Sequence, residues 1–361
     1  MLEKIDRILQ GNCLELLPTL PSESVDLIIA DPPYFMQTQG ELLRDNGEVF
    51  MGVRAAWDQF ESLQAYDSFC LAWLSECRRV LKAHGSIWVM GSFQNIYRLG
   101  YLMQNLGFWI LNDIIWAKPN PVPNFRGSRF CNAHESLLWC AKDKSARYTF
   151  NYKTMKALNH NKQERSVWHI GICMGAERLK GANGKKLHPT QKPQALLEKI
   201  ILSSSRPGDL ILDPFFGTGT TGAIAKKFKR HFLGIEQDSL FVQEATKRIA
   251  NITPVSNTLT QGALEVKPPK VSLKQLCAAG FLQDRQKFYD KQQNYICYLL
   301  EDRLHDDQEH LSIHQMAAKH LHKKNHNGWA YFYVFWKEEF VSVDLLRYAY
   351  AQRPYPPILK I

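Results

Sequence analysis

The sequence lacks a long apolar run, an N-terminal signal region and paired cysteines. No stretch of its 361 residues approaches the roughly 20 uninterrupted apolar residues of a membrane span, and the apolar stretch at 108–117 is interrupted by Asn112 and Asp113. The N-terminus has no basic segment followed by an apolar one, and the 8 cysteines form no Cys-x-x-Cys pair. These absences exclude a membrane span and predict a cytoplasmic protein with reduced cysteines.

Several metal-binding and nucleotide-binding motifs are also missing. His134-Glu135 lacks the second histidine of a zinc protease motif. Six of the 12 histidines lie beyond residue 300, but no paired cysteines accompany them, so we expect no metal site there. The glycine-rich segment that ends at Gly222 is not followed by Lys-Ser or Lys-Thr, which excludes a Walker loop.

The chain does carry an excess of positive charge, and one region accounts for it. The formal net charge is +10. Residues 117–192 contain 15 basic and 4 acidic side chains, whereas residues 1–116 contain 8 basic and 14 acidic ones. Phe125, Phe130 and Tyr148 are interleaved with the basic residues. This pattern indicates a surface for a polyanion such as nucleic acid, and a solvated charged face is the alternative.

Strands and helices alternate over most of the chain. Short, apolar, β-rich runs predict strands at 6–10, 24–30, 86–90, 109–116, 136–141, 209–213 and 231–236. Apolar residues at helical spacing predict helices at 66–82, 95–106, 193–204, 218–228 and 239–251. We expect Gly85 to end the first helix. The alternation predicts an α/β fold with a parallel sheet.

Two stretches interrupt this alternation. Between 119 and 188 the periodicity weakens, and prolines and polar turns predict a loop-rich insert. Residues 253–270 are proline-containing and predict a linker to a C-terminal region of different character. In that region, aromatic residues alternate along 329–336 and predict a strand with mostly buried rings. Trp329, which follows Asn-Gly, is the ring with the strongest claim to a functional role.

The segment Asp213-Pro-Phe-Phe-Gly-Thr-Gly-Thr-Thr-Gly222 follows a predicted strand and opens a predicted helix. Its glycines allow the backbone to approach a ligand, and the N–H groups at the helix start suit a carboxylate or phosphate. Glu236 ends the next predicted strand, where an acidic side chain can bind ribose hydroxyls. The segment therefore predicts a nucleotide-like cofactor, and it leaves a nicotinamide enzyme open as a rival.

The segment Asp31-Pro-Pro-Tyr34 lies directly after the predicted strand 24–30. It suits methylation of an exocyclic amino nitrogen, whose lone pair is delocalised into an aromatic ring. The Asp31 carboxylate and the Pro32 carbonyl can each accept one N–H, which favours a tetrahedral nitrogen, while the prolines stiffen the backbone. Tyr34 can stack on a base that has left the duplex.

Together these segments resemble the S-adenosylmethionine-dependent DNA amino-methyltransferases. Because the catalytic motif precedes the cofactor loop, the chain resembles their permuted β group. Further matches to the HinfI-type and cell-cycle-regulated adenine methyltransferases are Phe35-Met-Gln-Thr-Gln, Trp57-Asp-Gln-Phe60, Gly91-Ser-Phe-Gln-Asn-Ile-Tyr97, Asn120-Pro-Val-Pro-Asn-Phe125, Arg129-Phe-Cys-Asn-Ala-His-Glu135 and His188-Pro-Thr-Gln-Lys-Pro193.

The resemblance implies a fold and a domain organisation. It implies a Rossmann-like, circularly permuted α/β methyltransferase domain at 1–252, with an inserted recognition region at about 118–188. A linker at 253–270 and a small C-terminal α+β DNA-binding domain at 271–361 follow. The implied activity is methyl transfer from S-adenosylmethionine to adenine N6 of a flipped base in double-stranded DNA, within GANTC.

The resemblance also assigns roles to particular residues. The catalytic residues would be Asp31, Pro32, Pro33 and Tyr34. The S-adenosylmethionine site would comprise Asn12, Cys13, Asp31, Thr190, Lys192, Asp213, Phe215, Gly217, Gly219, Thr220 and Glu236, with no metal. Asn12 departs from the aspartate that is usual in Gly-Asp-Cys, where the acid meets the adenine amino group. An amide oxygen accepts the same hydrogen bond without charge, which predicts weaker cofactor binding.

The basic insert would then face double-stranded DNA. The expected DNA contacts are Arg44, Lys118, Asn124, Arg126, Arg129 and Asn132, with Ser312, His314, Asn327 and Trp329 in the C-terminal region. For any single arginine, a solvated position remains the more frequent outcome. The resemblance further implies a bacterial, cytoplasmic protein that associates with the nucleoid through DNA and has no membrane partner. It leaves open a homodimer and a partner nuclease in restriction-modification.

Three alternatives to adenine methylation remain. The same geometry serves N4 of cytosine, although aspartate in the first position of the catalytic motif favours adenine by resemblance. A nicotinamide dehydrogenase is disfavoured because too little βα alternation follows Glu236. A non-catalytic DNA-binding module is disfavoured by the presence of both motifs. Covalent C5-cytosine methylation is unsupported, because none of the 17 prolines precedes a cysteine as that family requires.

Overall fold

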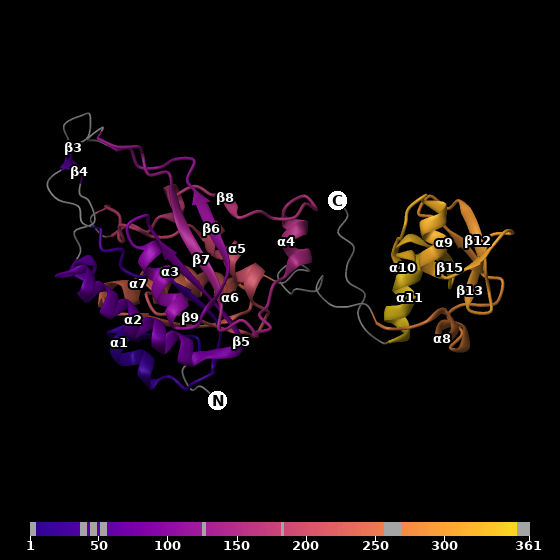
Figure 1. Ribbon diagram of the computed structural model, residues 1–361, viewed down its shortest axis with the longest axis horizontal. Helices are drawn as coiled ribbons and strands as arrows, with labels where there is room; N and C mark the ends of the chain where they lie inside the picture. Colours follow the sequence, from indigo (N-terminus) through magenta and orange to yellow (C-terminus); the bar gives the residue numbers. More distant parts are fainter. Residues whose placement is uncertain are drawn as a thin grey trace. The chain divides into compact units, whose positions relative to one another are not determined.

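The structure is a computed structural model that describes residues 5–36, 42–43, 49–50, 56–124, 128–181, 184–255 and 269–351. The chain divides into two compact units, Met1–Glu265 and Val266–Ile361 (Figure 1). Across the helices that lie in these described ranges, none combines the length and the apolar character that a membrane crossing requires. Each unit is built around its own sheet.

The first unit contains an eight-stranded sheet with the order β1-β10-β9-β2-β5-β7-β6-β8. Its strands are β1 (Arg7–Gln10), β2 (Val25–Ala30), β5 (Leu81–Gly91), β6 (Trp109–Ala117), β7 (His134–Ala141), β8 (Val167–His169), β9 (Leu210–Asp213) and β10 (His231–Glu236). A separate short pair consists of β3 (Leu42–Leu43) and β4 (Val49–Phe50). The region 118–188, predicted as a loop-rich insert, thus contributes two strands to the main sheet.

The prediction of a parallel sheet is correct for five strands and wrong for β7. Strands β1, β10, β9, β2 and β5 pair in parallel. Strand β7 runs antiparallel to both β5 and β6, and β8 pairs in parallel with β6. Strand β7 follows β6 in the chain and lies beside it in the sheet, so the chain returns along β7 in the direction opposite to β6.

Helices cover both faces of this sheet (Figure 1). They are α1 (Cys13–Leu16), α2 (Leu63–Val80), α3 (Ile96–Asn105), α4 (Tyr152–Leu158), α5 (Gln194–Ser204), α6 (Thr220–Lys227) and α7 (Ser239–Ala250), with short 3-10 turns at Leu17–Thr19, Ala56–Asp58 and Gly175–Glu177. Helices α1–α3 pack their apolar residues on one face, and α4–α7 on the other. Central strands such as β2 are buried on both faces, as expected for strands between two helical layers.

Helix α2 ends earlier than predicted. It stops at Val80, and the next residue, Leu81, already has the extended backbone that begins β5. Gly85 therefore lies within β5 and does not terminate a helix. A Cβ at this position would come within 2.6 Å of the Leu81 side chain and 3.0 Å of the Asp26 carbonyl oxygen, so glycine accommodates this close packing.

Within residues 269–351, the second unit contains a six-stranded antiparallel sheet and four helices. The sheet order is β14-β13-β12-β11-β15-β16. The strands are β11 (Lys287–Tyr289), β12 (Tyr295–Leu300), β13 (Arg303–His305), β14 (His310–Leu311), β15 (Tyr333–Trp336) and β16 (Glu339–Ser342). The helices are α8 (Leu273–Ala278), α9 (Ile313–His320), α10 (Gly328–Tyr331) and α11 (Val343–Tyr350). Apolar side chains from the sheet and from the helices form one core.

The predicted strand at 329–336 is half wrong, because its first part is helix α10 and only Tyr333–Trp336 forms a strand. The short helix brings Gly328 against the start of α9. A Cβ on Gly328 would lie 2.1 Å from the Ile313 carbonyl oxygen, which explains glycine at this position. Close packing between two helices therefore overrides the alternating pattern.

Candidate active site

Three acidic residues meet at one edge of the first sheet. Asp31 follows β2, Asp213 ends β9 and Glu236 ends β10. These strands run in parallel, so their carboxyl ends share an edge, which is the usual ligand-binding edge of an α/β sheet. All three residues line one cavity of about 590 Å³, which lies within the first unit.

The loop from Asp213 to Gly219 forms one wall of the cavity. The Asp213 carboxylate accepts hydrogen bonds from the Phe215 N–H (2.9 Å) and the Thr221 hydroxyl (2.6 Å). Gly217 and Gly219 have φ of +50° and +72°, which is the left-handed region that favours glycine. Gly219 directly precedes α6, so the N-terminus of that helix faces the cavity.

Glu236 supports the same loop from the neighbouring strand. Its Oε2 accepts from the Gly217 N–H at 2.7 Å, and its Oε1 accepts from the Asp238 N–H at 2.8 Å. Each carboxylate oxygen can accept a second hydrogen bond, so Glu236 retains capacity for ligand hydroxyls. The position suits the ribose-binding role that the sequence predicts.

The electrostatics of the cavity favour a positively charged ligand. Burial raises the pKa of Asp213 to about 7, against the hydrogen bonds from Thr221 and Phe215. Burial also raises the pKa values of Asp31 and Glu236. A cationic ligand would offset the cost of keeping these three carboxylates ionised. S-adenosylmethionine, which carries a sulfonium and an ammonium group, fits this requirement.

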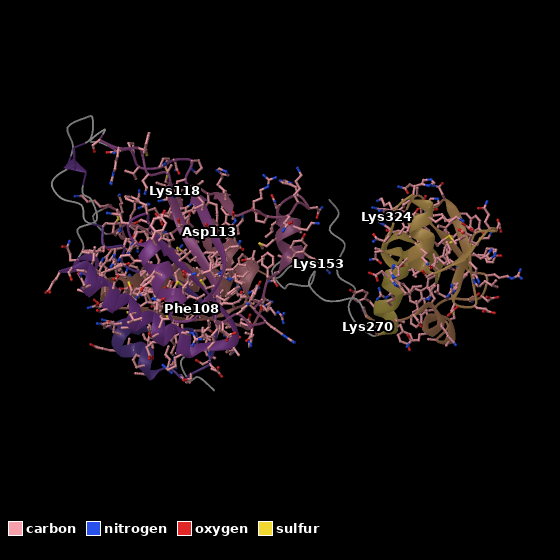
Figure 2. All side chains as sticks on the ribbon, viewed as in Figure 1. Phe108, Asp113, Lys118, Lys153, Lys270 and Lys324 are labelled. Carbon is pink, nitrogen blue, oxygen red and sulfur yellow. The ribbon has the colours of Figure 1, made fainter. Side chains whose placement is uncertain are left out.

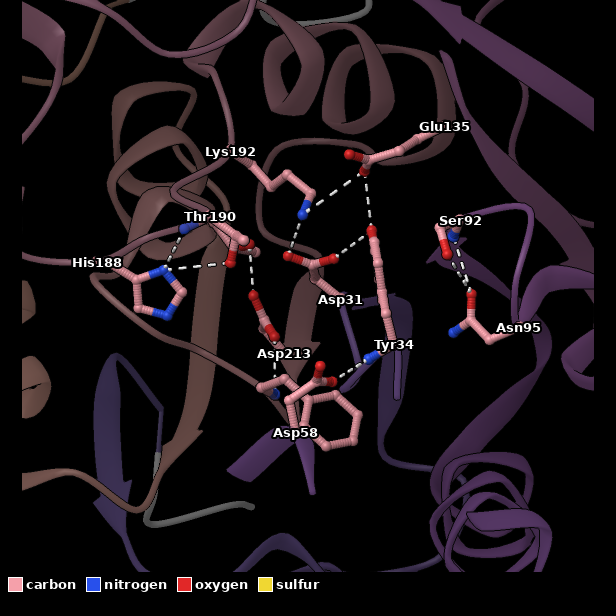
Figure 3. Close-up of polar contacts among 12 residues, drawn as sticks. Asp31, Tyr34, Asp58, Ser92, Asn95, Glu135, His188, Thr190, Lys192 and Asp213 are labelled. Atoms are coloured by element: carbon pink, nitrogen blue, oxygen red, sulfur yellow. Dashed lines mark hydrogen bonds and ion pairs between the residues drawn. The ribbon is translucent and has the colours of Figure 1, made fainter. Parts of the chain in front are cut away.

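A network of four charged side chains and one phenol includes two residues of the catalytic motif, and Figure 3 shows its members Asp31, Tyr34, Glu135 and Lys192. The Tyr34 hydroxyl lies 2.9 Å from both Asp31 Oδ1 and Glu135 Oε2. Lys192 Nζ lies 2.5 Å from Asp31 Oδ2 and 3.7 Å from Glu135 Oε2. Lys118 Nζ pairs with Glu135 Oε1 at 2.5 Å. Two carboxylates are thus balanced by two ammonium groups.

The network fixes the protonation state of its members. Burial alone would raise the pKa of Glu135, but Lys192 and Lys118 hold it below its ordinary value. Burial alone would lower the pKa of Lys192, but Asp31 and Glu135 outweigh this effect and hold the pKa above its ordinary value. Burial and the two carboxylates raise the pKa of Tyr34 well above that of a free phenol. Tyr34 therefore remains a neutral hydrogen-bond donor.

Asp58 holds the backbone of the catalytic loop. Its Oδ1 accepts from the N–H groups of Tyr34 (2.7 Å) and Phe35 (2.8 Å), and its Oδ2 accepts from the Met36 N–H (2.9 Å). Phe35 has φ of +51°, so the turn is strained for a non-glycine residue. Three successive N–H groups around one buried carboxylate form an anion nest that stabilises this turn.

A second support comes from α2 and α3. The Tyr66 hydroxyl donates to the Pro33 carbonyl oxygen at 2.9 Å, and it accepts from Asn95 Nδ2 at 2.8 Å. The Asn95 side-chain oxygen in turn accepts from the Ser92 N–H at 2.8 Å. This chain of hydrogen bonds fixes the carbonyl side of the loop, while Asp58 fixes its N–H side.

The structure thus shows supporting residues to which the sequence analysis gave no role. Asp58 and Glu135 belong to segments noted for their family resemblance, and Tyr66 and Asn95 lie at predicted helix starts. No local pattern connects any of them to the catalytic motif. The contacts of Asp58, Tyr66 and Glu135 with the catalytic loop span between 22 and 101 residues along the chain, so only the assembled fold reveals them.

His188, Thr190 and Lys192 line the same cavity. His188 Nδ1 accepts from the Thr190 N–H at 3.2 Å (Figure 3). The imidazole stacks against Trp57 at 6.0 Å between ring centroids and packs against Phe241 at 4.8 Å. Burial and the nearby Lys192 lower the pKa of His188 to about 4, so its ring is neutral at pH 7.

Asn12 and Cys13 also line the cavity. The Asn12 side-chain oxygen caps α1 by accepting from the Leu14 N–H at 2.9 Å. One of its lone pairs is therefore already used, which leaves the second one and the amide NH2 for a ligand. Burial raises the pKa of Cys13 to about 12, so this cysteine is a thiol at neutral pH.

The predicted DNA contacts of the first unit differ in their surroundings. Lys118 was expected to contact DNA, and its ammonium pairs with Glu135 in the active-site network, with 13% of its side chain exposed. Asn124 donates to the Arg129 carbonyl oxygen at 2.8 Å, and the Arg129 guanidinium lies 5.3 Å from the Phe93 ring. Asn132 is exposed. Arg44 and Arg126 lie outside the described residues.

The predicted contacts of the second unit have structural partners. Ser312 forms a capping box with Gln315 at the start of α9, and His314 Nδ1 accepts from the Gly328 N–H at 3.2 Å. Asn327 precedes α10 as its N-cap residue. Trp329 is 9% exposed and packs under the Arg347 guanidinium at 4.5 Å. Little of the Trp329 ring is therefore exposed within this unit.

The remaining basic residues of 117–192 are mostly exposed. Lys153, for example, lies on α4, whereas Lys118 of the active-site network directly follows β6 (Figure 2). The exposed basic side chains of this region are Arg129, Lys144, Arg147, Lys153, Lys162, Arg165, Lys180, Lys185 and Lys186. Burial of Lys118 and Lys192 in the network removes only two charges from the positive surface.

Comparison with protein families and curated proteins gives consistent results. The N6/N4 methyltransferase family model, described as DNA methylase, matches residues 25–247. The chain is 57% identical over 350 residues to the Type II methyltransferase M.HinfI of Haemophilus influenzae, covering 97% of this chain and 98% of that protein. It is 40% identical over 243 residues to the Type II methyltransferase M2.DpnII of Streptococcus pneumoniae, covering 67% and 88%.

Solved structures show the same fold. The M1.HpyAVI–SAM complex has a TM-score of 0.50 and 28% sequence identity, and the match covers 67% of this chain and 98% of that chain. The PvuII DNA methyltransferase (cytosine-N4-specific) has a TM-score of 0.53 and 22% identity, covering 72% and 91%. At that identity, the second match shows the fold alone.

Proposed function

The chain belongs to the N6/N4 DNA methylase family, and we propose that it methylates N6 of adenine within GANTC in double-stranded DNA. The methyl donor is S-adenosylmethionine, and the target adenine leaves the duplex to reach the active site. The observation that carries the proposal is the Asp31–Tyr34 turn. Its carboxylate, carbonyl and ring lie at the edge of a cavity whose acidic lining suits a cationic cofactor.

Asp31 and Pro32 orient the amino group. The Asp31 carboxylate and the Pro32 carbonyl each accept one N6–H, so the nitrogen lone pair turns toward the methyl carbon. Lys192 lies 5.1 Å from the centre of the Tyr34 ring, and the adenine stacks on the other face of that ring. Positioning of this kind supplies most of the catalysis, without a covalent enzyme intermediate.

The transfer must also dispose of a proton. As the N6–CH3 bond forms and the S–CH3 bond breaks, N6 becomes cationic and loses one proton. The Asp31 carboxylate would accept this proton from N6, and burial raises the pKa of Asp31, which makes it a suitable acceptor. Lys192 remains charged beside it and keeps the carboxylate ionised before the transfer.

The residues that would hold S-adenosylmethionine surround the rest of the cavity. Glu236 would bind the ribose hydroxyls, and Asn12 would accept from the adenine amino group. The N-terminus of α6 after Gly219 would face the carboxylate of the methionine part, near Thr190. When bound, S-adenosylmethionine supplies an activated methyl group on sulfur. The solved complex of M1.HpyAVI with SAM, at 28% identity, supports this choice of cofactor.

The exposed basic side chains at 129–186 would contact DNA phosphates. We expect the protein to act in the bacterial cytoplasm on nucleoid DNA, as the M.HinfI resemblance suggests. Changing Lys153 and Lys162 together to Gln should weaken duplex binding and reduce the salt slope by about 0.9 per lost phosphate contact. A Lys247→Gln change on α7 is the matched control. If the unchanged chain, the double variant and the control show the same salt dependence of duplex binding, the basic surface does not contact DNA and is only a solvated face.

Methyl transfer from labelled cofactor to short duplexes tests the proposal. We expect transfer to a GANTC duplex and a loss of about tenfold or more for each single substitution at its G, A, T or C position, but none for a change of the central base. Sedimentation of the complex between the protein and one duplex gives the number of chains per duplex, and two chains would indicate a homodimer. Equal transfer to all duplexes would overturn the sequence specificity, and no transfer to any would overturn the proposed function.

A further inference from the structure

Three side-chain oxygens form a short chain beside the cavity. Tyr34 Oη lies 2.9 Å from Asp31 Oδ1 on one side and 2.9 Å from Glu135 Oε2 on the other (Figure 3). A phenol carries a single hydrogen, so Tyr34 can donate to only one of the two carboxylates at a time. While both carboxylates are ionised, one of these contacts has no hydrogen between its oxygens, and lone pairs face each other across it.

One additional proton completes this chain of oxygens. If Asp31 Oδ1 carries the proton, it donates to Tyr34 Oη, and the Tyr34 hydroxyl donates to Glu135 Oε2, so both contacts become hydrogen bonds. Burial raises the pKa of Asp31. In Glu135, burial is outweighed by Lys192 and Lys118, which hold the pKa below its ordinary value. Asp31 is therefore the carboxylate that takes the proton, and Glu135 stays ionised.

Two ammonium groups and the main sheet hold the ends of this chain in place. Lys192 Nζ lies 2.5 Å from Asp31 Oδ2, and Lys118 Nζ lies 2.5 Å from Glu135 Oε1, so each carboxylate keeps its other oxygen toward Tyr34. Glu135 lies within β7, where its backbone pairs with Trp116 of β6. Its side chain is 13% exposed, which leaves it little room to turn away. The arrangement thus exists before a substrate binds.

We propose that Glu135 is a positioning residue that draws the Tyr34 hydroxyl away from Asp31 when Asp31 receives the N6 proton. The inference rests on the proposed function, because this proton comes from the methylated amino group. The N6–H bond breaks, its electron pair stays on N6, and an O–H bond forms on Asp31 Oδ1. Tyr34 keeps its own hydrogen and redirects it from Asp31 to Glu135. After product release the proton leaves Asp31, whose side chain is 21% exposed, for water.

The charges around Asp31 give the proposal a pH signature. The groups that act on this carboxylate or lie near it come from several elements: Lys192, Glu135, Tyr34, Asp58 and Asp213. After burial, Lys192 has the largest effect and lowers the pKa of Asp31, whereas the negative charge of Glu135 raises it. Removing the Glu135 charge should therefore lower the pKa of Asp31 and make it a weaker acceptor for the N6 proton.

Glu135→Gln changes both the charge and the direction of the hydrogen bonds. The new amide oxygen can accept from Lys118, which turns the NH2 group toward Tyr34 and leaves the phenol donating to Asp31. We expect kcat at saturating cofactor and DNA to fall by about 10- to 100-fold, with little change in KM for DNA. The acid limb of the kcat profile should move to lower pH. A purely structural role of Glu135 would lower kcat without moving this limb.

A double-mutant cycle shows whether Glu135 acts through the Tyr34 hydroxyl. Tyr34→Phe removes the hydroxyl and keeps the ring. In that background we expect Glu135→Gln to lower kcat by about threefold or less, because the group that it positions is already absent. Glu135→Asp keeps the charge on a shorter side chain, so it should restore the position of the acid limb and part of kcat. It also provides a second variant if Glu135→Gln does not fold.

The matched control is Glu198→Gln on α5. It removes a carboxylate that pairs with Lys227 at 2.5 Å and takes no part in the oxygen chain, so kcat and the acid limb should stay unchanged. Thermal unfolding of each variant shows whether it still folds. The proposal is wrong if Glu135→Gln leaves kcat and the acid limb unchanged, or if it lowers kcat equally with and without the Tyr34 hydroxyl.

Infrared titration of the protein without DNA separates this proposal from the proposed function. The protonated-carboxyl band that disappears in Asp31→Ala belongs to Asp31, and its midpoint should lie at lower pH in Glu135→Gln. If the chain methylates no duplex but shows this shift, the proposed function is wrong and the role of Glu135 is supported. If the chain methylates GANTC duplexes while kcat and the Asp31 midpoint are insensitive to Glu135→Gln, the function stands and the role of Glu135 is wrong.

Discussion

The two loops at the ligand-binding edge of the first sheet are held in different ways. The cofactor loop at 213–219 is held by near neighbours in the chain, through Phe215, Thr221 and the left-handed Gly217 and Gly219, and by Glu236 at the end of the next strand. The catalytic loop at 31–36 is held by Asp58, Tyr66, Glu135 and Lys192, which lie 22 or more residues away in the sequence. Local sequence thus encodes most of the first loop, whereas distant tertiary contacts position the second.

The largest effect should come from the catalytic loop itself. Asp31→Ala removes the acceptor of the amino N–H and of the proton, so we expect kcat to fall by about 1000-fold. The dissociation constant for S-adenosylmethionine should change much less, because the cofactor loop is held independently. Single-turnover methylation and calorimetry measure the two effects. If Asp31→Ala weakens cofactor binding but leaves kcat unchanged, the cofactor loop is not independent of the catalytic loop.

A smaller effect is expected when the support of the catalytic loop is removed. Asp58→Asn turns one acceptor oxygen into an NH2 group that faces backbone N–H groups. A lost charge-assisted hydrogen bond of this kind should lower kcat by about 10- to 100-fold. We expect KM for DNA and cofactor affinity to change little, because Asp58 acts through the loop.

The matched control for Asp58 is Asp67→Asn on α2. It weakens a half-exposed pair with Arg98 that does not touch the catalytic loop, and we expect less than about a twofold change in kcat. Asp58→Glu keeps the charge and should restore part of kcat. The interpretation fails if Asp58→Asn leaves kcat unchanged, or if it acts only by lowering the thermal stability.

The cofactor loop should respond to a change in its own backbone. Gly219 has φ of +72°, and a Cβ there would lie 2.7 Å from the Ala245 Cβ, so Gly219→Ala should weaken cofactor binding by about tenfold or more. Gly208 has φ of +85° but nothing within 4 Å of a Cβ. Gly208→Ala therefore tests strain without crowding and should leave cofactor affinity unchanged. Equal effects would show that crowding at Gly219 is unimportant.

The smallest expected effect is a pH dependence of cofactor affinity. Asp213 has a pKa of about 7 in the free protein, and a cationic cofactor prefers its ionised form. Affinity should therefore fall as the pH drops through 7, by about tenfold between pH 8 and pH 6. Thr221→Val removes a hydrogen bond that lowers this pKa and should shift the dependence to higher pH. Calorimetry that shows pH-independent affinity would contradict the role of Asp213.

The contrast between the loops explains what the sequence could predict. The strands that carry Asp31, Asp213 and Glu236 were predicted within one residue of their bounds at the ligand-binding edge. Glycine spacing indicates the cofactor loop because the φ values and packing it requires are local properties. The parallel direction of β7 was predicted wrongly, because a strand carries no local mark of its direction.

Residues whose roles depend on the assembled fold escaped prediction. Lys118 belongs to the basic segment from which DNA contacts were predicted. The pairing of β6 with β7 places its ammonium against Glu135. Trp329 follows a turn-like Asn-Gly pair, yet it packs in the core beneath Arg347. Asp58 lies 22 to 24 residues beyond the N–H groups that it binds. Only the positions of neighbouring elements distinguish these roles from surface roles.

The identity of the methylated atom tests the central claim most directly. A GANTC duplex is incubated with the chain and S-adenosylmethionine, then digested to nucleosides and analysed by mass spectrometry. The geometry around Asp31 and the family of the chain predict N6-methyladenine, and the Asp31→Ala variant should yield almost none. Detection of N4-methylcytosine, or of N6-methyladenine at undiminished levels with Asp31→Ala, would contradict the account.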